Sequence, residues 1–314
     1  MSDQTAAVVG AAQAVPDPKL ARISNDVEPA VPDAGLATRP VATRRRRGLS
    51  VNGAVTWVAA AWILVVVIAG LVPGLLVSGD PAEAQADRVL QAPGETLLGA
   101  DQYGRSVLAL LVHGARSAVL IGLGATTLAL LAGTTLGLFA GYAGGWLDMV
   151  IGRLVDVLMS FPGVLLALVI AAALGPTTTN LVIAVGIAAV PQFARVMRSQ
   201  TMTVRDRLYV EAARASGYSQ PRIILRHILP NAIGPIVVLA TLTIGVAIVL
   251  AASLSFLGLG PHQDLPDWGQ LLAQGQPYLE SAWWMSTFSG LAITLTVICL
   301  SVLGDALSDK FEEG

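Results

Sequence analysis

Five long stretches of this sequence contain no Asp, Glu, Lys or Arg. They are residues 48–79, 117–147, 157–194, 227–263 and 281–304. A helix that crosses a membrane needs about 20 mostly apolar residues to span roughly 30 Å of hydrocarbon, and every stretch is long enough. A soluble helix would carry charges on its wet face, yet only 13% of all residues are charged. The pattern therefore predicts an all-α integral membrane protein.

The number of spans depends on how the longest stretches divide. Residues 157–194 are about twice the length that one span needs, and a cluster of turn-forming residues, 175–180, lies in the middle. We interpret this stretch as two helices joined by a tight hairpin. Residues 227–263 carry their glycine and proline clusters at the two ends, so we interpret them as a single helix. The sequence therefore predicts six transmembrane helices.

Arginines indicate which ends of the helices face the cytoplasm. Arg44 to Arg47 precede the first span, and seven arginines fall within residues 195–226, whereas residues 264–280 contain no Lys or Arg. Because Lys and Arg concentrate on the cytoplasmic side, we predict that both basic regions and both termini are cytoplasmic. The predicted parts are a disordered cytoplasmic tail (1–47), a first transmembrane helix (48–79), an extracytoplasmic segment (80–116), and a five-helix core (117–310) with a cytoplasmic loop (199–229).

The sequence carries no recognisable catalytic or nucleotide-binding motif. It has no GxxxxGKS/T loop, and its two lysines, Lys19 and Lys310, stand outside glycine-rich turns. Its histidines lack the spacing of metal ligands. Asp148 and Asp156 fall near predicted cytoplasmic ends, and Arg153 is spaced to pair with Asp156 on one helix face. We therefore expect neither catalysis nor a cofactor in this chain, and an energy source outside it.

One basic segment has the features of a compact docking element. Residues 206–216 are good helix formers that end at Gly217, where glycine permits a left-handed backbone and a sharp corner. Pro221 then suits the first turn of a second helix, and Arg214 and Arg222 offer positive charge to an acidic partner. An ordinary basic loop between two helices is the alternative, and physical reasoning alone leaves both interpretations open.

The same segment resembles a known family. Glu-Ala-Ala at 211–213, a glycine four residues after the second alanine, and His-Ile-Leu-Pro-Asn at 227–231 are similar to the EAA loop of ABC importer permeases. In that family the loop forms a coupling helix that fits a groove on a cytoplasmic ATPase. The resemblance implies that Glu211, Ala212, Ala213 and Gly217 dock on the ATPase. We add Arg214 and Arg222 to the candidate ATPase-coupling residues because of their positive charge.

Further motifs between residues 95 and 310 are similar to the C-type subunit of the dipeptide, oligopeptide and nickel permeases. They are Leu98–Arg105, His113–Arg116, Gly141–Asp148, Phe161-Pro162, Leu254–Gly260, Pro266–Gly269 and Leu303–Asp305. Asp101, Gly104 and Arg105 belong to the outer segment of this family pattern. Ala100 and Ser106 depart from it, because Thr and Asp are usual there.

This resemblance implies a type I ABC importer permease in the bacterial cytoplasmic membrane, with ATP and Mg²⁺ bound by partner subunits. The implied partners are a homologous B-type permease, two ATP-binding subunits or one fused ATPase, an extracytoplasmic substrate-binding protein and membrane lipid; no nucleic acid is expected. The implied cargo is a di- or oligopeptide, with nickel chelates and glutathione-like peptides as alternatives in the same class. An ion-coupled secondary carrier is the rival from another class, and the scarcity of buried charge disfavours it.

Two more features carry expectations about packing and contacts. Glycines recur every four residues at 133, 137, 141 and 145, and this spacing lets two helix backbones approach closely. We expect static packing within the subunit, with Gly144-Gly145 in a turn. In the outer loop 259–285, candidate contacts for the binding protein are Asp264, Asp267 and Trp268. Trp283 and Trp284 are typical of an aromatic belt at the membrane surface.

Overall fold

The computed structural model describes residues 53–78, 80–94, 96–261 and 265–312, with side chains described as far as residue 309. The predicted tail, residues 1–47, therefore lies outside the described residues, and so does Asp264. In the described chain, extended segments pair at two isolated β-bridges, Pro93 with Thr96 and Ala100 with Ser106. The remaining regular structure is helical, as predicted.

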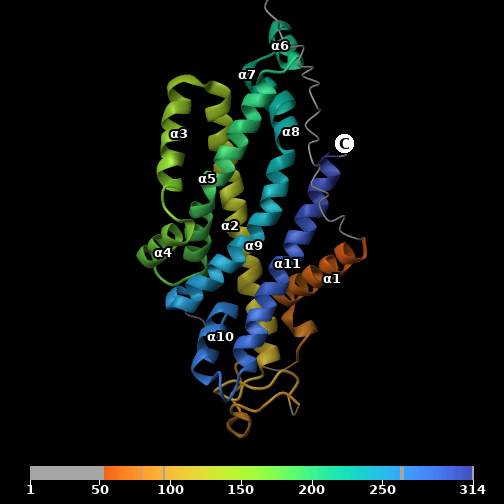
Figure 1. Ribbon diagram of the computed structural model, residues 1–314, viewed down its shortest axis with the longest axis vertical. Helices are drawn as coiled ribbons and strands as arrows, with labels where there is room; N and C mark the ends of the chain where they lie inside the picture. The colour runs from red at the N-terminus through yellow and green to blue at the C-terminus, as the bar shows by residue number, and fades with distance from the viewer. Residues whose placement is uncertain (1–52, 79, 95, 262–264, 313–314) are drawn as a thin grey trace, which may run out of the picture. The chain divides into compact units, whose positions relative to one another are not determined.

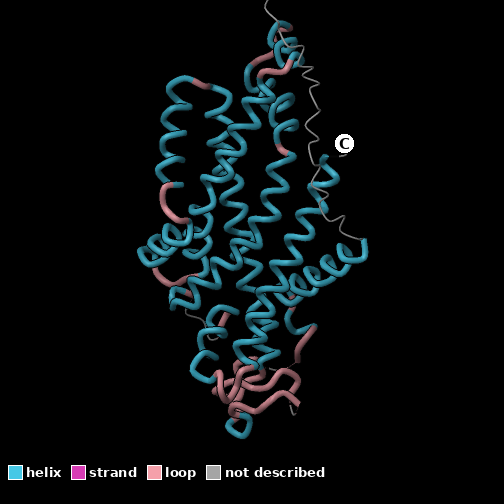
Figure 2. The backbone as a smooth tube through the Cα atoms, in the orientation of Figure 1, coloured by secondary structure: helices cyan, strands magenta, loops and turns pink. Residues whose placement is uncertain are grey.

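Long helices form a bundle that carries short helices at both ends (Figure 1). The α-helices are α1 (Gly53–Leu71), α2 (Val107–Ala143), α3 (Gly145–Met159), α4 (Gly163–Leu174), α5 (Thr178–Arg205), α6 (Leu208–Ala215), α7 (Gln220–Ile223), α8 (Leu229–Ala232), α9 (Gly234–Leu254), α10 (Trp268–Gly275) and α11 (Trp284–Glu312). The shorter 3₁₀ or π-helical turns are η1 (Pro73–Leu75), η2 (Ala86–Arg88), η3 (Ile224–Ile228), η4 (Ser255–Leu259) and η5 (Gln276–Tyr278). Figure 2 shows that the irregular connection between α1 and α2 gathers at the end of the bundle opposite α6.

In the described residues five helices are long and apolar enough to cross a membrane: α1, α2, α5, α9 and α11. Helices α3 and α4 satisfy that test only as a pair, and they are bent by 89°. If the bent pair is counted as one span, the described residues contain the six predicted spans. The prediction of one continuous helix before the hairpin is wrong, because this part of the chain forms two helices, α3 and α4. Pro162 explains the bend, because it lacks an amide hydrogen and disfavours the helical conformation at Phe161.

Helix α2 begins ten residues before the uncharged stretch that predicted it. Its N-cap is Ser106, whose hydroxyl accepts a hydrogen bond from the Ala109 amide at 3.4 Å, and the helix then includes His113 and the exposed Arg116. The residues 107–116 assigned to the outer segment are therefore helical. Charged side chains near a helix end can reach water along their own length, so the first charge does not mark the end of the helix.

The predicted hairpin between α4 and α5 is confirmed. Gly175 adopts φ = 90°, which only glycine adopts without strain. Thr177 caps α5 by accepting the Asn180 amide, and the Asn180 side chain donates to the Leu174 carbonyl at 2.7 Å. These bonds satisfy polar groups at the end of α4 that lack a partner within the helix. The hairpin thereby places the start of α5 beside the end of α4.

Helices α2 and α5 approach so closely that only glycine fits on α2. A Cβ atom at Gly133 would lie 2.5 Å from the Cβ of Phe193, and one at Gly137 would lie 2.3 Å from the Ala194 carbonyl oxygen. Phe193 and Met197 are fully buried in the same contact. The glycines therefore pack within the subunit, as predicted. Gly144 and Gly145 both have positive φ and form the turn between α2 and α3, as predicted.

We predict that Gly137→Ala lowers stability by about 1–3 kcal/mol, because the added methyl group has to displace backbone atoms of α5. Gly152→Ala on α3 is the matched control, since a Cβ there meets no atom within 4 Å and alanine favours the helix. The measurement is the thermal unfolding midpoint of each purified variant in detergent. Equal midpoints for Gly137→Ala and the parent would contradict the close approach.

Candidate functional site

The loop between α5 and α9 forms a rigid corner. Gly217 adopts φ = 79°, and the amides of Gly217 and Tyr218 donate to the carbonyls of Arg214 and Ala213 at 3.0 and 3.2 Å. This pair of bonds is the Schellman motif, which closes a helix when a left-handed residue follows it. Helix α7 begins at Gln220 with Pro221 in its first turn. Both the glycine corner and the second helix were predicted, and both are confirmed.

Some side chains of this corner are buried in the core of the bundle, and others are exposed. Val210, Ala213 and Ile223 are buried in the same core cluster as Phe193 and Met197 of α5. The opposite side, which we name the loop surface, consists of the exposed residues Leu208, Tyr209, Glu211, Ala212, Arg214, Gly217, Tyr218, Arg222 and Leu225. All the predicted coupling residues except the buried Ala213 lie on it. Leu208 and Leu225 are 83% and 65% exposed, so large apolar side chains lie among the charged ones.

Two tyrosines hold the arginines of the loop. The guanidinium of Arg214 lies 5.8 Å from the ring centre of Tyr142, and that of Arg222 lies 5.7 Å from the ring centre of Tyr218. Tyr142 stands at the end of α2, and its hydroxyl donates to the side-chain oxygen of Gln220. Glu211, in the first turn of α6, makes no ion pair with the described residues. The loop is thus joined to α2 as well as to α5, and Glu211 stays available to a partner.

Asp101, Gly104 and Arg105 fold the loop between α1 and α2, at the other end of the bundle. The fully buried Asp101 accepts the backbone amides of Tyr103 and Arg105 at 2.9 and 2.8 Å, and the Arg105 Nε at 2.7 Å. Gly104 has φ = 77°, and a Cβ there would lie 1.9 Å from the Gln85 carbonyl oxygen. The motif therefore builds a tight, internally hydrogen-bonded loop in which both Asp101 and Arg105 are buried.

Asp267 and Trp268, the predicted contacts for a binding protein, are only 7% and 4% exposed. Asp267 caps α10 by accepting the amides of Gly269 and Gln270, and it also accepts the Ser255 hydroxyl at 2.8 Å. The Trp268 indole donates to the Leu111 carbonyl. These residues fix α10 to α2 and η4. An aspartate placed just before a short helix is itself a cap signal that could have been read from the sequence.

Trp284 also departs from its predicted place in an aromatic belt. Its indole is buried and donates to the Ala100 carbonyl at 3.0 Å, so it ties α11 to the loop between α1 and α2. Trp283 is half exposed, which fits a surface position. The two neighbouring tryptophans thus have different roles, because successive residues at the start of a helix point about 100° apart.

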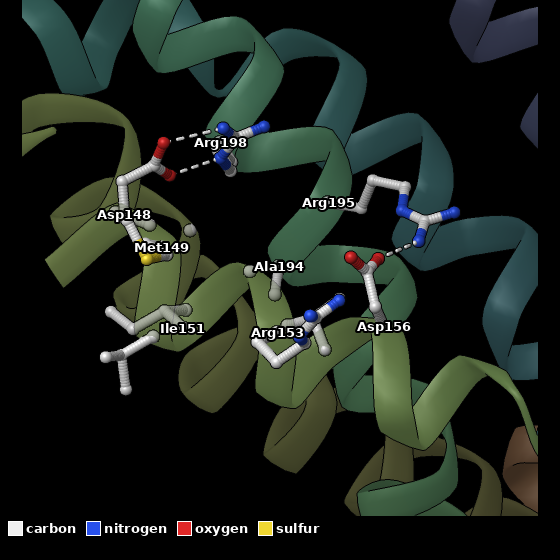
Figure 3. A pocket seen from close by; sticks show the side chains of 13 residues that line it. Asp148, Met149, Ile151, Arg153, Asp156, Ala194, Arg195 and Arg198 are labelled. Carbon is white, nitrogen blue, oxygen red and sulfur yellow. Dashed lines mark hydrogen bonds and ion pairs between the residues drawn. The ribbon is translucent and has the colours of Figure 1, made fainter. Parts of the chain in front are cut away.

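A cavity of about 610 Å³ opens between α3 and α5 (Figure 3). At one side of it Arg198 donates two hydrogen bonds to Asp148, and at the other Arg195 donates to Asp156 at 2.8 Å. The predicted pair of Arg153 with Asp156 is therefore wrong, since α5 presents Arg195 to the same carboxylate. These bridges fasten α3, which buries only Val155, to the bundle. The described residues contain no cluster of three potential metal ligands.

The comparison with protein families decides what kind of protein carries this loop. Residues 133–314, which include α3 to α11 and the loop surface, match the family described as "Binding-protein-dependent transport system inner membrane component". The chain belongs to this family. It is therefore a multi-pass inner membrane permease subunit of an ABC transport system, whose ATPase and substrate-binding protein are partner subunits.

Curated relatives support the same family across most of this permease. The dipeptide transport system permease protein DppC of Alkalihalophilus pseudofirmus is 40% identical over 76% of this chain and 79% of its own length. The di/tripeptide permease DppC of Pseudomonas aeruginosa is 38% identical, covering 80% and 85%. The glutathione permease GsiD of Pectobacterium atrosepticum is 40% identical, covering 72% and 75%.

A solved structure shows that the permease fold is shared. A chain of the MetNI methionine ABC transporter, solved in inward-facing conformations, aligns with a TM-score of 0.54 and 19% identity, covering 64% of this permease and 95% of that chain. At this identity the likeness concerns the fold alone. It confirms the predicted ABC importer permease architecture.

Asp267 gives the permease a testable pH dependence. Burial raises the pKa of this carboxyl, although its three hydrogen bonds act in the opposite direction. A raised pKa means that the folded state holds the proton more tightly than the unfolded state does. Stability is therefore greatest below the ordinary value of 3.8 and is lost as pH rises through the raised value.

We predict that Asp267→Asn removes this loss, because asparagine cannot ionise and its oxygen can still cap α10. Its unfolding midpoint in detergent should then depend less on pH above 3.8 than that of the parent. Asp267→Ala is the control, since it removes the cap and should cost about 1 kcal/mol. An Asp267→Asn variant with the parent's pH profile would show that the buried carboxyl does not titrate as stated.

Proposed function

We propose that this chain is one of two homologous permease subunits of an ATP-driven importer for di- and oligopeptides. The main support for this proposal is the 40% identity to a dipeptide transport system permease over three quarters of the chain. A di/tripeptide permease at 38% identity supports the same substrate class. Membership of the ABC permease family argues against the ion-coupled carrier, because such a system takes its energy from ATP on partner subunits.

The loop surface is the proposed docking site for the ATPase. It combines exposed apolar side chains (Leu208, Leu225) with the unpaired Glu211 and with arginines held by tyrosine rings. Charge-assisted hydrogen bonds from such groups are stronger than neutral ones, and preordered side chains lose less entropy on binding. We place this surface, with both termini, in the cytoplasm, because seven arginines fall within residues 195–226, which contain it, and four more, Arg44 to Arg47, precede the first span.

Glutathione is the second candidate cargo. A glutathione permease is as similar to this chain as the dipeptide permease is, at 40% identity, although over a slightly smaller share of the chain. Glutathione is a modified tripeptide, so both candidates place a short peptide in the same path. The discrimination therefore requires direct transport measurements.

Reconstitution tests this proposal. The chain is purified from its natural host together with its partner subunits, placed in proteoliposomes, and supplied with ATP and the binding protein. We expect co-purification of ATP-binding subunits and ATP-dependent uptake of radiolabelled dialanine, with glutathione as the comparison. Purification without any ATPase would contradict the importer, whereas uptake of glutathione but not dialanine would reassign the cargo.

We predict that Gly217→Val uncouples ATP hydrolysis from uptake while the protein still reaches the membrane. A non-glycine residue with positive φ costs about 1–2 kcal/mol, and a β-branched residue costs more, so the corner would open. Uptake per ATP hydrolysed should then fall by roughly tenfold or more. Ser216→Ala is the matched control, because Ser216 is exposed, adjacent and in an ordinary conformation. Normal coupling in Gly217→Val would show that the corner tolerates other shapes.

A further inference from the structure

A second cavity, of about 430 Å³, opens within the spans between α4, α5, α9 and α11. Thirteen residues line it, most of them on α5 and α9, and its polar side chains are Gln192, Thr243 and Ser253. None of these residues is charged, and most are small or apolar. The volume lies in the range of about 300–1,000 Å³ that is typical of sites for small ligands.

Gln192 is the exceptional side chain in this cavity. Thr243 and Ser253 also line it, but their hydroxyls donate to the carbonyls of Leu239 and Val249 in their own helix at 2.7 and 2.8 Å. Gln192 is exposed and has no hydrogen-bond partner among the described residues. Its amide therefore keeps both donors and its acceptor oxygen unused.

The position of Gln192 makes that exposure costly in lipid. It lies near the middle of α5, which runs from Thr178 to Arg205 and is long and apolar enough to span the membrane. Moving an unpaired amide into hydrocarbon costs about 4–8 kcal/mol on the cyclohexane scale. Groups of this kind in membrane helices face water or a polar partner. The cavity side of α5 therefore meets something other than lipid tails.

We infer that this cavity is this chain's wall of the translocation path and that the Gln192 amide hydrogen-bonds the backbone of a peptide in transit. A side-chain amide carries the same donor and acceptor as a peptide unit, so it pairs with the backbone whatever the peptide's side chains are. An uncharged wall likewise selects neither acidic nor basic cargo. The inference rests on the proposed peptide function and adds the residue that contacts the cargo.

Thiol labelling in the assembled transporter tests the path. Cys299, the single native cysteine, is first replaced by serine, and Gln192→Cys or Leu131→Cys is then introduced. Leu131 is the control because it is exposed on α2 and lies outside both cavities. The probe is a charged, membrane-impermeant methanethiosulfonate, which reacts with thiols that water reaches. Dialanine uptake by the Cys299→Ser parent is measured in parallel.

We expect labelling of Gln192→Cys at least about tenfold faster than of Leu131→Cys, and slower labelling when dialanine, binding protein and ATP are supplied. Equal, slow labelling of both variants, with dialanine uptake by the parent intact, would overturn the inference and leave the peptide function standing. Labelling of Gln192→Cys that dialanine does not slow, again with uptake intact, would overturn the contact. If the parent imports neither dialanine nor glutathione, the proposed function fails and the inference fails with it.

A second variant tests the hydrogen bond itself. Gln192→Leu keeps a similar side-chain volume but removes the donor and the acceptor. We expect its dialanine uptake, measured at equal amounts of assembled complex, to fall by about three- to tenfold, the range that the loss of one hydrogen bond gives. Uptake equal to the parent's would overturn the proposed bond.

Discussion

The close contact between the backbones of α2 and α5 holds the other parts of this permease in place. Lipid tails are as apolar as leucine, so helices in a membrane gain little from hiding apolar side chains against each other. Contact at backbone distance supplies the missing attraction through dispersion, and the glycines of α2 allow it. Helix α5 then carries the arginines that fasten α3 and leads directly into α6. The packing of α2 against α5 therefore determines where the loop surface lies.

Polar residues that look like functional signatures mostly satisfy the backbone. The carboxylates of Asp101 and Asp267 accept hydrogen bonds from backbone amides of a loop and a helix end. Arg205 donates to the Gly141 carbonyl at the end of α2. An unsatisfied polar group costs most where water is scarce, so such residues are essential to a membrane protein without touching cargo or partner. Glu211 and Gln192 are both exposed and make no ion pair or hydrogen bond with the described residues, so they are informative about contacts with other molecules.

The sequence predicted features that depend on local chemistry. Stretches without charge indicated the spans because lipid excludes charge, and Gly175, Gly217 and Pro221 indicated turns because of their backbone preferences. Features set by tertiary contacts were missed. Asp156 has one candidate arginine on its own helix, and only the packing of α5 supplies the other, Arg195. The bend at Pro162 did have a local signal, because proline disfavours a helix that continues through it. The exposure of Gln192 is decided by four helices together, so no spacing within α5 reveals it.

Helix α2 has a mechanical consequence for the whole complex. It is uninterrupted for 37 residues, or about 55 Å, which is nearly twice the roughly 30 Å of the hydrocarbon layer. The Trp268 indole donates to the Leu111 carbonyl near the beginning of α2, and Tyr142 in its last turn donates to Gln220 at the start of α7. A tilt of only about 5° would shift one tip relative to the other by about 5 Å. One unbroken helix therefore joins the Trp268 contact at one end of the bundle to the Tyr142–Gln220 contact at the other.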